Sequence, residues 1–281
     1  MGELVVDRGG FELRGWDRGG RPGGPVVVCV HETATSGEVW RPLAEELGSG
    51  VRVTAYDRRG WGRSGAPADY RRTTIGEQAA DLAAVAGEEE VVLCGAGIGA
   101  MVVLEFAVRG AGRIRGVLMI EPPLLSLVPE ATPAISADVE AIRRAVTAAA
   151  SRVGDEATPA ATAQAGADAA LDLFLGGGLG ALGAGAERIP DRIARTATNG
   201  SFALFAEVAA TSAWELPLAE LAMLEFPVAT AVSRSTPPFV RRAAEALAAR
   251  LPGGDLRELA GSGLPQLGSS EELAVALREL S

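Results

Sequence analysis

The chain has 281 residues, of which 48% are hydrophobic and 22% charged, and this length allows one large domain or two small ones with a full hydrophobic core. The net charge is −10, from 36 acidic and 26 basic residues, so we expect neither nucleic acid nor an anionic membrane as a partner, because both need clustered positive charge. All the basic residues are arginines, which excludes Schiff-base chemistry, a pyridoxal anchor and a phosphate-loop lysine. The chain has one histidine, His31, which excludes a histidine-rich metal site.

The two cysteines, Cys29 and Cys94, each lie inside an apolar run. We expect both to be reduced residues of the core and not a zinc pair. The N-terminal sequence MGELVVDRGG lacks the pattern of a signal peptide, and no stretch reaches the roughly eighteen uninterrupted apolar residues of a membrane span. These features predict a cytoplasmic protein without a membrane anchor.

The first part of the chain alternates strand and helix patterns. Residues 3–7 and 10–16 alternate apolar and polar side chains around Gly9 and Gly10, which predicts a β-hairpin. Apolar runs typical of strands buried on both faces follow at 26–30, 51–56, 91–94 and 116–120. Helical patterns lie between them at 38–47, at 74–86, and after GAGIGA up to Arg109. This alternation predicts a mostly parallel sheet flanked by helices.

The character of the sequence changes between residues 123 and 225. This stretch is rich in alanine and predicts helices at 136–151, 159–174, 187–197 and 202–211. The glycine-rich segment 175–186 is interpreted as a connector, because no phosphate-loop motif follows it. Strand and helix patterns then return at 228–232, 238–250, 255–259 and 270–280. We therefore expect a core formed by 1–122 and 226–281, with 123–225 as a helical cap.

Five segments in this order resemble the α/β-hydrolase fold. The strand, oxyanion loop and helix that open such a core resemble VVVCVHETATSGEVWRPLAEEL, and the next strand and loop resemble VTAYDRRGWGRSGAP. The nucleophile elbow corresponds to VVLCGAGIGAMVVLEFAVR. The strands that carry the acid and the histidine correspond to PVATAVSRSTPP and LRELAGSGLPQLGSSEELAVAL. The resemblance implies an α/β-hydrolase fold with an N-terminal hairpin and a helical cap insertion.

The same resemblance implies a degenerate catalytic triad. The elbow motif G-x-S-x-G corresponds to residues 95–99, which places Gly97 at the nucleophile position. Its surroundings are closer to the G-x-D-x-G-A elbow of the epoxide hydrolase and dehalogenase branch. The histidine position is Gly263 and the acid position falls near Ser235. Loss of all three groups predicts that covalent hydrolysis does not occur at this elbow.

A dinucleotide-binding interpretation of the elbow competes with this one. The sequence GAGIGA also fits the fingerprint G-x-G-x-x-A, and Glu121 ends the next strand, where a ribose-binding acid would lie. The fingerprint normally opens its domain, however, and the segments that precede it here match the hydrolase order. We therefore favour the hydrolase fold and expect no cofactor.

Three residues are candidates for catalysis. Glu32 replaces the glycine that usually follows His31 in the family, and a carboxyl group in an apolar pocket can serve as general acid or base; alternatively, it turns outward or pairs with an arginine. His31 is a second candidate, although a histidine here is often structural. Glu121 lies where some dehalogenase-like members place their acid, and it either acts directly or caps the following backbone.

Further residues are expected to complete the site. The backbone amides of Thr33 and Ile98, beside the space left by Gly97, are expected to form an oxyanion-type hole. An apolar pocket wall is predicted from Trp40, Trp61, Phe202, Phe205 and Trp214. Ion pairs that hold the loops are expected from Asp57, Arg58 and Arg59.

These features predict a cofactor-independent, non-hydrolytic enzyme without a metal, acting on an apolar small molecule. Cyclisation, isomerisation, epoxide opening and elimination need orientation and proton transfer but no covalent ester. Analogy with repurposed members of this fold implies an intermediate of bacterial natural-product biosynthesis as the substrate. Two alternatives remain open: a non-catalytic ligand-binding pseudo-enzyme, and a hydrolase, for example of epoxides, that uses water activated by Glu32 or Glu121.

Overall fold

A computed structural model of the chain describes residues 1–68, 70–110, 112–154, 157–183, 189–194 and 201–281. Within them, eight strands form one sheet in the order β1-β2-β4-β3-β5-β6-β7-β8. Their bounds are β1 Gly2–Asp7, β2 Glu12–Arg18, β3 Val26–Val30, β4 Arg52–Tyr56, β5 Glu90–Ala96, β6 Arg113–Ile120, β7 Val228–Ser233 and β8 Asp255–Leu259. Strand β2 pairs antiparallel with both β1 and β4, and every other pairing is parallel.

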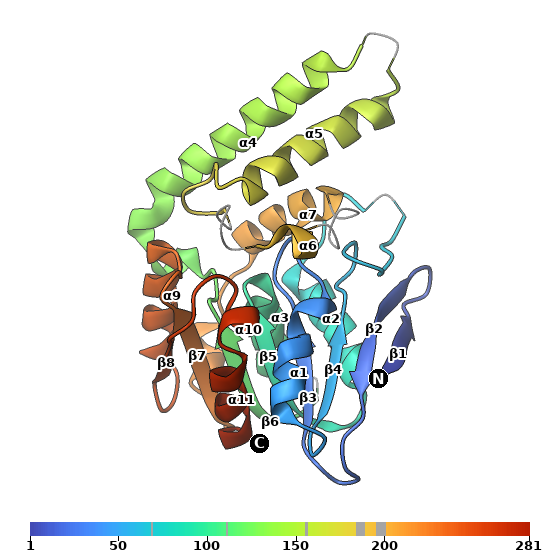
Figure 1. The fold of residues 1–281 in the computed structure, drawn as a ribbon. Helices are drawn as coiled ribbons and strands as arrows, with labels where there is room; N and C mark the ends of the chain where they lie inside the picture. The colour runs from blue at the N-terminus through green and yellow to red at the C-terminus, as the bar shows by residue number, and fades with distance from the viewer. Residues whose placement is uncertain (69, 111, 155–156, 184–188, 195–200) are drawn as a thin grey trace.

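Helices pack on both faces of this sheet (Figure 1). One face, with Val27 and Cys29, packs against α1 (Arg41–Leu47) and α11 (Ser270–Glu279). The opposite face packs against α2 (Ile75–Ala86), α3 (Ile98–Val108) and α9 (Pro238–Ala248). Alternate side chains of each parallel strand therefore enter different halves of the core, which explains the uninterrupted apolar runs.

The connection from β6 to β7 holds the predicted helical insertion. It contains α4 (Thr132–Arg152), α5 (Pro159–Leu175), α6 (Asp191–Ala194), α7 (Ser201–Ala213) and α8 (Leu218–Leu221). Figure 1 shows α4 and α5 as a long hairpin that projects from the molecule, with α7 between this hairpin and the strand ends. Short helices complete the fold: α10 (Pro265–Gly268) and the 3₁₀ turns Gly37–Trp40, Leu125–Leu127 and Pro129–Ala131.

The sequence-based predictions of the sheet are confirmed. The hairpin, the parallel strands and their flanking helices form at the expected positions, with shifts of a few residues at their ends. The helix expected at 187–197 is described only as α6, because its ends and the end of the glycine-rich segment lie outside the described residues. The domain boundaries near 122 and 226 stay a prediction. None of the helices that the structure describes is long and apolar enough to cross a membrane.

Candidate active site

A pocket lies between the carboxyl ends of the central strands and the helical insertion. It encloses about 830 Å³ of space, including solvent at its mouth. The strand ends and the segments that directly follow them contribute Glu32, Thr33, Gly97, Ile98, Glu121, Pro123, Leu125, Pro237 and Val240 to its wall. The insertion contributes Phe174, Ala181, Leu182, Gly183, Leu204, Glu207, Val208, Thr211 and Ser212. This location, above the carboxyl ends of parallel strands, is where open α/β sheets bind ligands.

The sharp turn from β5 into α3 is formed by Gly97. Its backbone has φ +54° and ψ −126°, a conformation that favours glycine. A Cβ atom at this position would lie 2.7 Å from the Cβ of Glu32, closer than two such atoms approach. Glu32 therefore occupies the space that an elbow nucleophile would need.

The other glycines of the elbow are required by close packing. A Cβ at Gly95 would lie 2.3 Å from the carbonyl oxygen of Gly99, and a Cβ at Gly99 would lie 2.3 Å from the carbonyl oxygen of Val30. Both contacts involve backbone atoms, which cannot move aside cheaply. The glycine spacing of GAGIGA is thus explained by the packing of α3 on the strands, without a nucleotide.

Backbone amides are available beside Gly97. Ile98 is the first residue of α3 and lines the pocket, and the first N–H groups of a helix have no partner within that helix. Thr33, which follows Glu32 in the loop after β3, lines the pocket from the other side. A helix N-terminus favours developing negative charge, so this end of the pocket suits a carbonyl or enolate oxygen.

The Glu32 carboxylate is held from the loop after β8. The buried side chain of Gln266 in α10 donates from Nε2 to Glu32 Oε1 at 2.9 Å. The family resemblance places the histidine at Gly263, and Gln266 lies three residues after it. A side-chain amide from this loop therefore contacts the carboxylate beside the elbow.

The other two expected triad positions also meet. The N–H of Gly263 donates to Ser235 Oγ at 2.8 Å, and Ser235 Oγ donates to the carbonyl oxygen of Gly263 at 3.2 Å. A hydroxyl and a peptide group thus lie at the positions where the family resemblance places an acid and an imidazole, and neither residue is among the described residues that line the pocket. This pair closes two loops and offers no general base.

Glu121 is the second carboxylate at the strand ends. It follows β6 with φ +49°, a left-handed conformation that is unusual for a residue with a side chain, and is only 6% exposed. Its Oε1 atom accepts from Ser233 Oγ at 2.8 Å and from Thr236 Oγ1 at 2.5 Å. These two hydroxyls, from the end of β7 and the loop after it, fix the direction of the carboxyl group.

His31 lies outside this pocket wall, which corrects its expected catalytic role. The side chain is fully buried. Nε2 accepts from the backbone N–H of Arg58 at 2.8 Å, so Nδ1 carries the proton that it shares with the Glu32 carbonyl oxygen at 2.7 Å. Burial, and next the positive charge of Arg58, hold the pKa of His31 well below its ordinary value of 6.5. The imidazole is therefore neutral, and its nitrogens hold the loop that carries Glu32.

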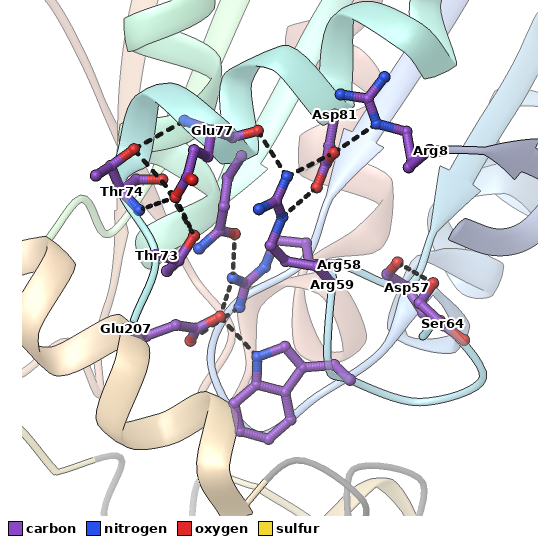
Figure 2. A network of polar contacts seen from close by, with 12 residues as sticks. Arg8, Asp57, Arg58, Arg59, Ser64, Thr73, Thr74, Glu77, Asp81 and Glu207 are labelled. Atoms are coloured by element: carbon purple, nitrogen blue, oxygen red, sulfur yellow. Dashed lines mark hydrogen bonds and ion pairs between the residues drawn. The ribbon is translucent and has the colours of Figure 1, made fainter. Parts of the chain in front are cut away.

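A buried ion pair joins the insertion to the same loop. Figure 2 shows the Arg58 guanidinium directed at the carboxylate of Glu207, which lies on α7. Both side chains are at most 2% exposed. Glu207 also accepts from Thr33 Oγ1 at 2.8 Å and from Trp61 Nε1 at 2.6 Å, while Arg58 Nε donates to the His31 carbonyl oxygen at 2.8 Å. The residues around Glu32 are thus tied to the insertion by charge.

The expected ion pairs of the loop after β4 lie side by side with this network (Figure 2). Arg59 pairs with Asp81 of α2 at 2.6 Å, and Arg8 pairs with the same carboxylate at 2.8 Å. Asp57 accepts from the backbone N–H groups of Gly37 and Arg63. Burial raises the pKa of the Asp57 carboxyl, and these two N–H groups oppose that rise. These contacts connect elements of the core.

The glycine-rich segment forms part of the pocket wall. The buried carboxylate of Asp138, on α4, accepts from the backbone N–H groups of Gly180, Ala181 and Leu182 at 2.6 to 2.8 Å. The last two of these residues line the pocket. In its described part, this connector is therefore clamped by one side chain, a role that the sequence did not indicate.

The expected aromatic wall is wrong for this pocket. The indole of Trp61 is buried against Glu207, and that of Trp214 donates to Glu105 Oε2 of α3 at 2.9 Å. Trp40 is fully buried in the core. Neither Phe202 nor Phe205 is among the lining residues that the structure describes, where Phe174 of α5 is the aromatic one. Composition identifies aromatic residues but not the face on which each lies.

The two cysteines of the chain lie in the core of the sheet. Cys29 and Cys94 are free, buried and directly opposite each other on β3 and β5, and burial raises the pKa of the Cys94 thiol. Over the described ranges, no group of three or more His, Cys, Asp or Glu side chains could hold a metal ion.

Known proteins share this architecture. A thermophilic esterase from Thermogutta terrifontis is 22% identical, with a TM-score of 0.67 over 99% of this chain and 97% of its own. The enol-lactonase from Burkholderia xenovorans LB400 is 20% identical, with a TM-score of 0.66 over 99% of both chains. At these identities the likeness shows the fold alone.

Sequence comparison gives a shorter match and a family. The curated protein "Probable oxidoreductase EphD" of Mycobacterium tuberculosis is 39% identical over 88 residues, which are 31% of this chain. The match spans only 15% of the length of EphD. The model of the alpha/beta hydrolase family matches residues 27–276. The expected fold is thereby confirmed, and the chain belongs to the alpha/beta hydrolase family.

Proposed function

We propose that the pocket is an acid–base active site in which Glu32 takes the place of the elbow nucleophile. The reaction is a non-hydrolytic conversion of a largely apolar small molecule: cyclisation, isomerisation, intramolecular epoxide opening or elimination. One observation carries this proposal. The Cβ of Glu32 fills the space beside Gly97, and Glu32 lines the pocket next to the elbow, where the family's covalent chemistry begins.

The residues at the triad positions argue against ester hydrolysis. Covalent hydrolysis needs a nucleophile, and then a base to activate water. The chain has Gly97 at the elbow and Gly263 at the histidine position, and its single imidazole is bonded to backbone on both nitrogens. Family membership supports the scaffold and a small-molecule pocket, while the reaction is inferred from the residues that line it.

In the proposed mechanism Glu32 moves a proton and the elbow amides stabilise charge. The Gln266 amide holds one carboxylate oxygen at 2.9 Å, which orients the group toward the substrate. The backbone N–H groups of Ile98 and Thr33 bind an oxygen of the substrate as it gains negative charge. The apolar walls orient the substrate, which is the main requirement of an intramolecular cyclisation or isomerisation.

Hydrolysis by activated water is the second candidate, and Glu121 favours it. Glu121 lines the same pocket, two hydroxyls hold its carboxyl group, and its backbone has a left-handed conformation. Strained residues of this kind concentrate at functional sites. The structural neighbours named above include an esterase and a lactonase. A product that contains oxygen from solvent water would distinguish this reaction from the non-hydrolytic ones.

The proposal can be tested in the organism that encodes the protein. The gene is deleted and the metabolites are compared by accurate mass, after which the deletion strain is complemented with wild type, Glu32→Gln or Glu38→Gln. Glu38 is a matched control, because it pairs with Arg41 and lies outside the pocket wall. We expect wild type and the control to restore the lost compound and Glu32→Gln to fail.

Each outcome of this experiment has a distinct meaning. A lost product isomeric with the accumulated compound supports cyclisation, isomerisation or intramolecular opening, and a product lighter by one water supports elimination. A product heavier by one water supports the second candidate. Full restoration by Glu32→Gln contradicts the role of Glu32, and an unchanged profile on deletion supports a non-catalytic ligand-binding protein. We also propose that the substrate is an intermediate of natural-product biosynthesis, which the mass of the accumulated compound would test.

A further inference from the structure

The polar side chains of the pocket share one chemical property. Among the described lining residues, these are the carboxylates Glu32, Glu121 and Glu207 and the hydroxyls of Thr33, Thr211 and Ser212. A charged carboxylate only accepts hydrogen bonds, whereas a hydroxyl can donate one and accept two. The hydroxyl protons therefore decide whether these side chains can donate to a ligand.

Each of the three hydroxyl protons is directed into the protein. Thr33 Oγ1 donates to Glu207 Oε2 at 2.8 Å. Thr211 Oγ1 donates to the carbonyl oxygen of Glu207 at 2.8 Å, and Ser212 Oγ donates to the carbonyl oxygen of Val208 at 2.9 Å. The last two are bonds to the preceding turn of α7, a common arrangement for hydroxyl side chains in helices. Toward the pocket, these hydroxyls can therefore act only as hydrogen-bond acceptors.

From this arrangement we infer that the ligand donates hydrogen bonds to the α7 wall, through hydroxyl, phenol or amine N–H groups. The inference rests on the pocket of the proposed function and names the class of molecule that it binds. A donor on the ligand meets the free lone pairs of Thr211 and Ser212. A ligand whose oxygen is capped as an ether has no donor, so it displaces water from half-buried Thr211 and exposed Ser212 without replacing the hydrogen bonds that this water made.

The elbow end of the pocket has the opposite polarity. There, the amides at the start of α3 donate, and they suit a carbonyl or enolate oxygen. The two ends together fit an apolar molecule with a hydroxyl or amine group at one side and a carbonyl group at the other. A hydroxylated or phenolic carbonyl compound has this pattern.

The test compares two probes of the same ring skeleton, 2-naphthol and 2-methoxynaphthalene, by titration calorimetry on the full chain. We expect 2-naphthol to bind about tenfold more tightly, because one well-placed hydrogen bond has about this effect. The Thr211→Val/Ser212→Ala variant should reduce the ratio to about twofold or less, mainly by weakening naphthol. Ser212→Ala alone should give an intermediate ratio.

Ser136→Ala is the matched control. Ser136 is a serine of α4 that donates to the preceding turn in the same way, to Thr132 at 2.9 Å, and lies outside the pocket wall. It should leave both affinities unchanged. Equal binding of the two probes, binding of neither, or a ratio that the α7 variant leaves unchanged would overturn the inference. Failure of Glu32 as the acid–base group would instead appear as turnover by Glu32→Gln, which this binding ratio does not measure.

Discussion

The pocket has two walls that carry a carboxylate, here called the Glu32 wall and the Glu121 wall, and they are held in place by different contacts. Glu32 lies in a loop held by His31 and Arg58, and Arg58 is neutralised by Glu207 of the insertion. Glu121 is held by hydroxyls from β7 and the loop after it, inside the core.

Because of this difference, a movement of the insertion is expected to affect the two carboxylates unequally. A shift of α7 would move the charge that neutralises Arg58, and with it the loop that carries Glu32. The same shift would leave the hydroxyl contacts of Glu121 unchanged. The insertion is therefore expected to control one carboxylate of the site and not the other.

Glu207→Gln should lower the unfolding free energy most and disturb the loop that carries Glu32. It removes the charge that compensates a buried guanidinium, which typically costs about 3–5 kcal/mol of unfolding free energy. Because His31 is the single histidine of the chain, its imidazole ¹⁵N signals report on this loop without overlap. We expect denaturant unfolding to show the loss and these signals to shift in the folded variant.

Glu105→Gln is the matched control for that prediction. Glu105 is also a buried glutamate that contacts the insertion, through Trp214, but from α3. It should lower stability without moving the His31 signals. A Glu207→Gln variant with unchanged His31 signals would show that the ion pair is a structural tie without influence on the loop.

Gly97→Ala tests the space beside Glu32. Backbone strain at positive φ of about 1–3 kcal/mol and overpacking of about 1–3 kcal/mol should together lower the unfolding free energy by about 3 kcal/mol. Gly87→Ala supplies the strain alone, because Gly87 has φ +62° with nothing within 4 Å of the added Cβ. In a Glu32→Gly background the excess cost at 97 should disappear. Equal costs at 87 and 97 would mean that Glu32 does not fill this space.

Ser233→Ala should weaken the Glu121 wall alone. Loss of a hydrogen bond to a charged carboxylate should lower stability by about 1.5–3 kcal/mol, as measured by denaturant unfolding. The ¹⁵N signals of His31 should stay unchanged, because Ser233 lies at the end of β7 and bonds to Glu121 there, whereas His31 lies in the loop after β3. A shift of the His31 signals in this variant would show that the two walls are coupled through the core.

The pH dependence of stability gives the smallest effect. His31 has a depressed pKa in the folded state, so the unfolded chain binds more protons below its ordinary pKa of 6.5. The stabilisation is therefore complete above pH 6.5 and is lost as the pH falls from there toward the folded-state pKa, with a slope of up to about 1.4 kcal/mol per pH unit. His31→Asn should flatten this slope in unfolding experiments between pH 7 and 5. A slope that persists would assign it to other groups.

Much of the fold could be predicted from the sequence. Uninterrupted apolar runs identify the parallel strands, since burial on both faces removes any alternation. The place of Gly97 also followed from motif order alone. That Glu32 fills the space beside it did not follow, because the direction of one side chain depends on the loop conformation around it.

The missed residues depended on contacts across the chain. Glu207 contacts Arg58 over 149 positions, and its one signal in the sequence is a single acidic residue in the apolar stretch FALFAEVAA. Gln266 had no such signal. The aromatic residues were misplaced for the related reason that hydrophobicity predicts burial but not which cavity a ring faces.

Proton transfer by Glu32 without the addition of water can be tested on the purified protein. The compound that accumulates in the deletion strain is therefore incubated with purified wild type and Glu32→Gln in H₂¹⁸O. We expect wild type to form a product without ¹⁸O and Glu32→Gln to form none. Incorporation of ¹⁸O by wild type, or undiminished conversion by Glu32→Gln, would contradict this expectation.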